Sequence, residues 1–206
     1  VVDGQVIGLG DADGDGDLDL LVRFAGRDDS NGVIYHDRVR LFINNTPITN
    51  ADGTLTAAGG VTEPVGLPAS ADTAGEAVNV FDFALTDGGG GDSTALGVSS
   101  LAVHTSGTGD FSKVTWLLSG PDASNVTGTY NAGASTINFS GLNISVNDGG
   151  SETYAIRAYF NSTSGLSNGQ TYVLSIDGDT DVTTTAGSTR MAVGQLAVNN
   201  GTGSVI

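Results

Sequence analysis

Short apolar segments separated by glycine-rich turns are the feature that most limits the folds open to this chain. Asp-Gly and Asn-Gly pairs such as Asn168-Gly169 and Asp177-Gly178 suit tight turns, because these residue types tolerate positive φ. Helical periodicity is hard to find. The predicted strands are Gln5–Leu9, Leu18–Phe24, Arg38–Ile43, Val78–Leu85, Val98–Thr105, Lys113–Leu118, Val126–Tyr130, Thr136–Phe139, Glu152–Phe160, Thr171–Ile176 and Arg190–Val198. This spacing predicts an all-β fold, an antiparallel β-sandwich with almost no helix.

Alternation within two of these segments predicts which side chains form the core. One set is Val114, Trp116 and Leu118, and the other is Tyr154, Ile156, Ala158 and Phe160, with Arg157 outside. Trp116 also has a second interpretation, as a platform on which a ligand stacks. A lone tryptophan between alternating apolar residues favours the core.

Charge and cysteine content narrow the classes of function. The chain has 23 acidic and 7 basic residues, a formal net charge of −16 and no cysteine. Such a surface repels nucleic acid and anionic membranes, and divalent cations are its natural counter-charge. Without disulfides or thiolate metal sites, stability must come from a core, from oxygen-ligated metals or from assembly. No signal peptide and no apolar run long enough to cross a bilayer is visible.

The strongest motif lies near the start of the chain. In Asp11-Ala12-Asp13-Gly14-Asp15-Gly16-Asp17-Leu18-Asp19, carboxylates stand at relative positions 1, 3, 5 and 9, and a glycine stands at position 6. Calcium takes six to eight hard oxygen ligands, and this spacing matches the first part of an EF-hand loop. Position 12 is Val22 instead of Glu, and the residues after the loop are strand-like. We therefore expect calcium as the cofactor, with a solvated acidic turn as the alternative.

The loop resembles those of FG-GAP/VCBS-type repeats, whose form is DxDxDGxxDLLV. Val6-Ile7-Gly8-Leu9-Gly10 before it and VRLFINN after it match that repeat as well. The resemblance implies a calcium site whose ligands are Asp11, Asp13, Asp15, Asp17 (through its carbonyl) and Asp19. In that family the repeat usually forms one propeller blade, and the single copy here cannot close a propeller.

The second region resembles the tandem immunoglobulin-like repeats of very large bacterial surface adhesins. The residues that carry this resemblance include Val80-Phe81-Asp82-Phe83-Ala84-Leu85-Thr86-Asp87-Gly88 and Thr115-Trp116-Leu117-Leu118-Ser119-Gly120-Pro121. Such repeats act mainly as spacers and assembly units, so the resemblance implies no catalysis.

Weaker metal candidates lie in later turns. Asp177, Asp179 and Asp181 are spaced by two, which fits either a second calcium site, assisted by Asp82 or Asp87, or a solvated turn. Asp92, Asp148 and Glu152 also lie in or beside glycine-rich turns. His36 and His104 have no metal-binding motif around them, and we expect ordinary strand or loop residues there.

These observations predict three segments and one class of function. Residues 1–50 form a calcium-binding β unit, 51–75 a linker or packing segment, and 76–206 an immunoglobulin-like sandwich. We expect a non-enzymatic, extracellular structural or adhesive module of a bacterial surface. It is either an adhesin repeat or a filament subunit completed by a strand of a neighbouring copy. A carbohydrate-binding or hydrolase-associated accessory module is the alternative, and a glycan or host-surface ligand remains open.

Overall fold

The computed structural model describes residues 4–10, 19–24, 38–42, 51–89 and 92–206. The chain divides into two compact units, residues 1–49 with 91–93, and residues 50–90 with 94–206. The fold is all-β, as predicted, and the described residues contain only two short 3₁₀ turns, η1 (Ala74–Glu76) and η2 (Phe111–Lys113). Within those ranges no helix has the length and apolar character to cross a membrane.

The first unit contains a three-stranded antiparallel sheet. Its strands β1 (Gly4–Gly10), β2 (Asp19–Phe24) and β3 (Arg38–Phe42) follow one another in that order. The register pairs Gly10 with Asp19 at one end and Gly4 with Phe24 at the other. A bulge between Val6 and Gly8 leaves Ile7 without an opposite residue. These strands correspond closely to the three that alternation predicted for residues 1–50.

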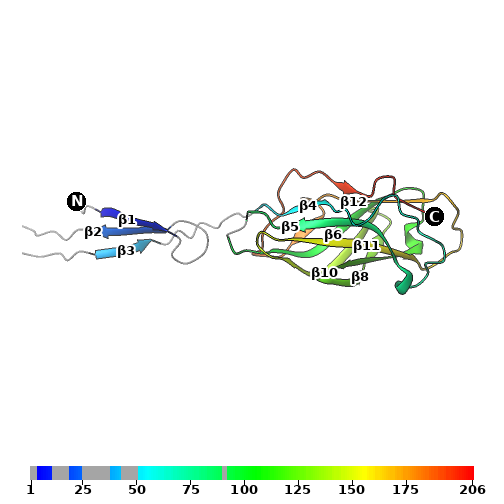
Figure 1. Cartoon of the computed structure of the whole chain (residues 1–206), viewed down its shortest axis with the longest axis horizontal. Helices are drawn as coiled ribbons and strands as arrows, with labels where there is room; N and C mark the ends of the chain where they lie inside the picture. The colour runs from blue at the N-terminus through cyan, green and yellow to red at the C-terminus, as the bar shows by residue number, and fades with distance from the viewer. Residues whose placement is uncertain (1–3, 11–18, 25–37, 43–50, 90–91) are drawn as a thin grey trace, which may run out of the picture. The chain divides into compact units, whose positions relative to one another are not determined.

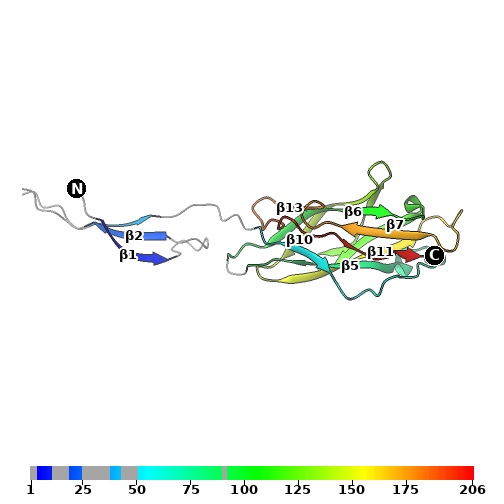
Figure 2. The same ribbon diagram turned by 90° about the horizontal axis from the view of Figure 1, so that it is seen from above.

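The second unit is a sandwich of two antiparallel sheets (Figures 1 and 2). One sheet has the order β4-β5-β11-β7-β8, and the other has the order β14-β12-β6-β10-β9, with β13 pairing β6 and β15 pairing β12. The bounds are β4 Thr54–Ala57, β5 Val78–Thr86, β6 Leu96–Ser106, β7 Val114–Gly120, β8 Ala123–Thr127, β9 Thr129–Asn131, β10 Thr136–Val146, β11 Ser151–Phe160, β12 Thr171–Ile176, β13 Val182–Thr184, β14 Val198–Asn199 and β15 Ser204–Val205.

The core lies between the two sheets and confirms the predicted alternation. Both predicted sets are buried, Val114, Trp116 and Leu118 on β7, and Tyr154, Ile156, Ala158 and Phe160 on β11. Leu117, on the other side of β7, is buried as well. Trp116 is 1% exposed, stacks on Phe111 and donates its indole N–H to the Phe111 carbonyl at 3.2 Å. It is therefore a core residue and not a ligand platform.

Three predicted strands differ from the structure, and one of them, Thr136–Phe139, is only the first part of β10, which continues to Val146. Val126–Tyr130 is divided at Gly128, so that β8 pairs with β7 in one sheet and β9 pairs with β10 in the other. A Cβ at residue 128 would lie 2.6 Å from Ile137 and 2.7 Å from Phe139, which explains the glycine at this crossing. Arg190–Val198 is mainly a loop, because the chain turns at Gly194, whose φ is +76°.

The proline- and glycine-rich segment 51–75 packs as part of the sandwich. Its strand β4 pairs with β5 from Thr54↔Thr86 to Ala57↔Phe83. Leu55 and Leu67 are buried in the core, and the Leu67 N–H donates to the Val205 carbonyl at 2.9 Å. Of the two interpretations of this segment, the described structure has the packing one.

Candidate metal site

The β1–β2 hairpin brackets the acidic motif. Gly10 and Asp19 are the last directly opposed pair of the two strands, so residues 11–18 connect them. Asp11, Asp13, Asp15 and Asp17 lie outside the described residues. Asp19 is described, and it opens β2 with only 1% of its surface exposed. A buried carboxylate is costly unless hydrogen bonds or a positive charge compensate it, and Asp19 makes interactions of its own.

The structure places Asp177, Asp179 and Asp181 together in the turn between β12 and β13. Asp181 Oδ2 accepts from the Asp177 N–H at 2.7 Å, and Asp181 Oδ1 lies 2.9 Å from His104 Nε2. Asp177 Oδ1 accepts from the Asp179 N–H at 3.3 Å. These bonds hold the turn from inside, and the Asp181 N–H closes it on the Asp177 carbonyl at 2.9 Å.

Asp179 carries the same turn into a neighbouring loop. Its Oδ2 accepts from the Gly194 N–H at 2.5 Å, and Gly178 lies so close to the Gln195 side chain that a Cβ would meet Gln195 Oε1 at 2.4 Å. Each of the three carboxylates therefore accepts at least one hydrogen bond from a backbone N–H of the protein itself, without a cation. Among the residues that the structure describes, no group of three His, Cys, Asp or Glu is placed to hold a metal ion.

The pKa values of two carboxyl groups in this turn are shifted in opposite directions. The hydrogen bond with the Asp179 carboxyl raises the pKa of Asp177 above its ordinary value, and partial burial adds to the rise. The same hydrogen bond lowers the pKa of Asp179, helped by the Gly194 N–H. As the pH falls, the shared proton is therefore held by Asp177, while Asp179 keeps its negative charge.

The acids of the other turns have structural partners. Asp82 does not assist the 177–181 turn, because its Oδ2 accepts from the Gly60 and Val61 N–H groups at 2.7 and 3.1 Å. Asp87 is buried and accepts from Thr189 Oγ1 at 3.3 Å. Glu152 accepts from the Tyr154 hydroxyl at 2.6 Å. The contacts of Asp82 and Asp87 anchor loops onto the sandwich, whereas the Glu152 bond lies within β11.

One acidic neighbour was not recognisable in the sequence. Asp52 lies directly against the glycines that follow Asp87, and a Cβ on Gly89 would be 1.9 Å from Asp52 Oδ2. Asp52 Oδ1 is shielded from solvent and has no hydrogen-bond partner among the described residues. The only sequence signal was the glycine run from Gly88, which permits this close approach. Asp92 and Asp148 lie in the adjoining turns and make further interactions of their own.

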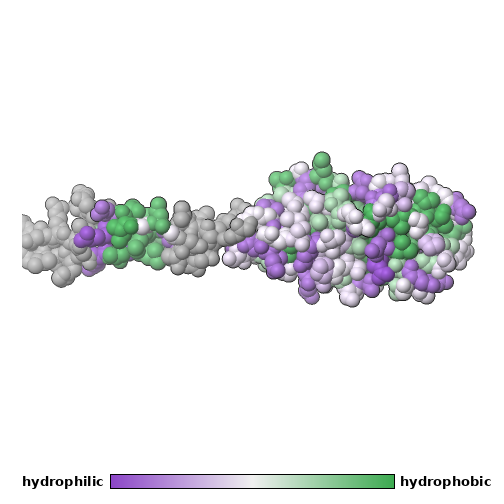
Figure 3. Space-filling view, in the orientation of Figure 1, coloured by the Kyte–Doolittle hydropathy of each residue, from purple (hydrophilic) through white to green (hydrophobic). Residues whose placement is uncertain are grey.

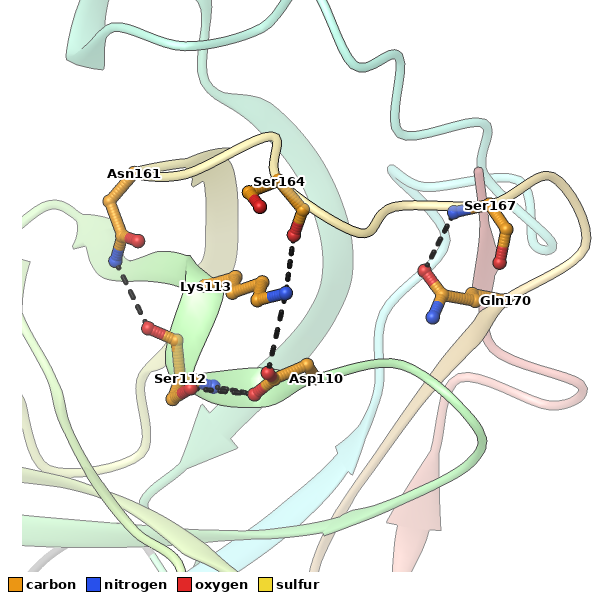
Figure 4. Close-up of polar contacts among 7 residues, drawn as sticks. All are labelled: Asp110, Ser112, Lys113, Asn161, Ser164, Ser167 and Gln170. Atoms are coloured by element: carbon orange, nitrogen blue, oxygen red, sulfur yellow. Dashed lines mark hydrogen bonds and ion pairs between the residues drawn. The ribbon is translucent and has the colours of Figure 1, made fainter.

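Lys113 sits in a polar cluster at the η2 turn (Figure 4). Its ammonium donates to the Ser164 carbonyl and lies 3.8 Å from the Asp110 carboxylate. Asp110 also accepts from the Ser112 N–H and hydroxyl, which lowers its pKa. These contacts fasten the segment between β11 and β12 onto the β6–β7 connection. Lys113 donates to the main-chain carbonyl of Ser164 and not to its side-chain hydroxyl. The arrangement is that of a structural clamp.

Comparison with protein-family models, with curated proteins and with solved structures finds no match. The resemblances drawn from the sequence therefore stay predictions.

Proposed function

We propose that this chain is a calcium-stabilised structural module that works outside the cell by joining neighbours, as an adhesin repeat or as the subunit of a filament. The observation that carries the proposal is the closed β1–β2 hairpin around the acidic motif, with Asp19 buried at its end. Directly opposed Cα atoms in an antiparallel pair are about 5 Å apart. The connection that carries Asp11, Asp13, Asp15 and Asp17 thus starts and ends at nearly one point.

The charge crowded into this connection supports a cation. A chain of eight residues that returns to its origin reaches at most about 14 Å away, because each residue spans at most about 3.5 Å. Four aspartates confined to this reach repel one another. A calcium ion would turn that repulsion into binding free energy, and metal binding would then stabilise the strand pair that flanks the loop. Asp11, Asp13, Asp15, the Asp17 carbonyl and Asp19 are the proposed ligands.

The sandwich favours a structural role over a catalytic or carbohydrate-binding one. Most of its large aromatic residues, including Trp116, Tyr154, Tyr172 and Phe139, are fully buried and fill the core, whereas Tyr130 and Tyr159 are partly exposed. Within the sandwich, β4 lies toward one end and the C-terminus lies at the other (Figures 1 and 2). An arrangement of this kind suits copies that follow one another in a line, which both versions of the proposal require.

Calcium titration of the full chain tests the proposal. We expect calorimetry to detect uptake, and hydrogen exchange to show β1–β3 amides that lose protection in chelator while β5, β6 and β11 keep theirs. Stabilisation by a ligand at 100 times its dissociation constant is about 2.7 kcal/mol, so the loss in the first unit is about 100-fold in exchange rate.

A matched pair of variants makes this test specific. Asp13→Ala with Asp15→Ala should abolish the calcium effect, whereas Asp28→Ala with Asp29→Ala removes the same charge outside the alternating motif and should preserve it. Calcium protection that survives in the first variant would place the ion elsewhere. The asserted ligand set would then be wrong.

A further inference from the structure

Two exposed surfaces of this chain are both apolar, and they carry opposite charges. One is a face of the three-stranded sheet, and the other is the loop between β13 and β14. In Figure 3 hydrophobic side chains gather over β1–β3 on the face in view. Each surface shows large aliphatic side chains to solvent, which marks sites of association in soluble proteins.

The sheet face is defined by the register of its strands. Directly opposed residues share a face, so Val6, Val22 and Arg40 form one row and Leu9, Leu20 and Phe42 form the next. A third row contains Gly4, Phe24 and Arg38. We call these nine positions the apolar face.

The apolar face combines exposed hydrocarbon with positive charge. Leu9 is 67% exposed, and Val6 and Phe42 are also exposed, whereas the central Val22 is buried. The opposite face of the sheet exposes Val39 and Leu41, and Arg38 and Arg40 distinguish the apolar face from it. Arg40 lies 6.0 Å from the centre of the Phe24 ring, which keeps its guanidinium over the apolar surface. The first 50 residues contain nine acidic and four basic residues, so the positive charge of this face is local and comes from Arg38 and Arg40. The face therefore suits a partner that is apolar in its centre and acidic at its rim.

The loop of residues 191–197 has those properties. Val193 is 90% exposed and Leu196 is 87% exposed, although both lie in a segment of fixed backbone. The carboxylates of Asp177 and Asp179 lie beside them, because the Gly194 N–H donates to Asp179. Residues 51–206 carry fourteen acids and only three basic residues, so the surroundings of this loop are strongly negative.

Several bonds hold the 191–197 loop in one conformation. Gln195 Oε1 accepts from the Leu55 N–H at 2.8 Å, and Gln195 Nε2 donates to the Ala192 carbonyl at 2.8 Å and the Gly53 carbonyl at 3.3 Å. The Ala192 N–H donates to the Gly53 carbonyl at 2.8 Å. These bonds fix the backbone of the loop while Val193 and Leu196 remain exposed. Preorganised apolar side chains lose little conformational entropy on binding.

We infer that the 191–197 loop of one copy docks on the apolar face of a second copy, with Asp177 and Asp179 near Arg38 and Arg40. Such a contact joins two different surfaces, so it leads from copy to copy instead of closing a symmetric pair. The inference rests on the proposed structural function and deepens it by naming the partner, a second copy of this chain.

The size of the face predicts a weak contact. Three strands about 4.8 Å apart and about 20 Å long present roughly 300 Å², well below the 800 Å² or so that each partner buries in a stable complex. We therefore expect a dissociation constant on the order of 10 to 100 μM for one contact. Repetition along a filament, or linkage of copies in one chain, would strengthen it through effective concentration.

Sedimentation of the full chain in calcium buffer, from about 10 μM to about 1 mM, tests the inference. The unaltered chain should form species that grow with concentration. Val193→Asp with Leu196→Asp should weaken association at least tenfold, and so should Val6→Asp with Leu9→Asp. Thr127→Asp with Thr129→Asp adds the same charge on the β8/β9 side of the sandwich and should leave association unchanged. Arg38→Gln with Arg40→Gln tests the sheet face again without altering β1.

Mixing the two defective variants gives the decisive result. The loop variant keeps an intact sheet face, and the face variant keeps an intact loop, so an equal mixture should form a dimer and stop there. A monomer at every concentration of the unaltered chain, or a mixture that stays monomeric, overturns the inference. Calorimetry on the same samples separates it from the calcium proposal, since association without calcium uptake would contradict only the latter, and uptake without association only the former.

Discussion

The two units treat their apolar side chains in opposite ways. In the sandwich the largest hydrophobic residues, among them Trp116, Tyr154 and Phe139, are less than 2% exposed. In the three-stranded sheet most of the large apolar residues of β1 and β3 face solvent. The sandwich can therefore be stable on its own burial, whereas a three-stranded sheet of this kind depends on something outside its strands. The sandwich therefore buries its large apolar residues apart from those of the 191–197 loop, whereas the three-stranded sheet leaves most of those in its outer strands exposed.

The largest expected effect concerns the core of the sandwich. Trp116→Ala should lower the free energy of unfolding of the sandwich by about 3–5 kcal/mol, because it removes a fully buried side chain and leaves a cavity. Val6→Ala, at an exposed position of β1, should change the stability of the chain by less than about 0.5 kcal/mol. Denaturant unfolding followed by hydrogen exchange reports the two units separately. Equal effects of both substitutions would erase the distinction between the units.

An intermediate effect concerns the rigid frame of the 191–197 loop. Gln195→Ala should destabilise the sandwich by about 1–3 kcal/mol, since it leaves the Leu55 N–H without its acceptor. Gln170→Ala is the matched control. Gln170 Oε1 accepts one bond from the exposed Ser167 N–H at 3.2 Å (Figure 4), and its loss should cost about 0.5 kcal/mol at most. Thermal melting of both variants measures the difference, and equal shifts would show that Gln195 does not hold the loop.

The smallest effect is a pH dependence in the 177–181 turn. Because the folded pKa of Asp177 is raised above 3.8, the folded state binds its proton more readily, so this group's contribution to stability falls as the pH rises through that region. Asp179, with a lowered pKa, contributes stability that is present above 3.8 and lost on further acidification. Carboxyl NMR titration should find the midpoint of Asp177 above that of Asp179. In Asp179→Asn the midpoint of Asp177 should fall toward its ordinary value, and an unchanged midpoint would refute the shared hydrogen bond.

Alternation made much of the fold predictable, since a strand buried on one face shows its period directly. Thr171–Ile176 was predicted with the same bounds that β12 has. Strand β4 was missed because its four residues lie in a segment rich in alanine, glycine, threonine and proline, where strand alternation is weak. Its pairing with β5 is set by tertiary contacts that local propensity does not encode.

The candidate sites were less predictable than the strands. The spacing of Asp177, Asp179 and Asp181 identified a turn in which carboxylates converge. It did not reveal that their oxygens are bonded to the chain itself, because the partners His104 and Gly194 are distant in sequence. The Asp11–Asp19 motif is local, and its prediction therefore rests on the spacing within one short segment. Only Asp19 of that motif lies among the described residues.

Because the chain crosses from one sheet to the other at Gly128, the two sheets are joined differently on the two sides of the sandwich. On the β8/β9 side, one continuous polypeptide serves both layers, so parting them there would require tearing a strand out of two sheets at once. On the opposite side, near β4 and β14, the Gly53 N–H donates to the Arg190 carbonyl and the Leu55 N–H donates to Gln195 Oε1. Under tension or heat we expect the two sheets to stay joined at Gly128 and to separate first on the β4/β14 side.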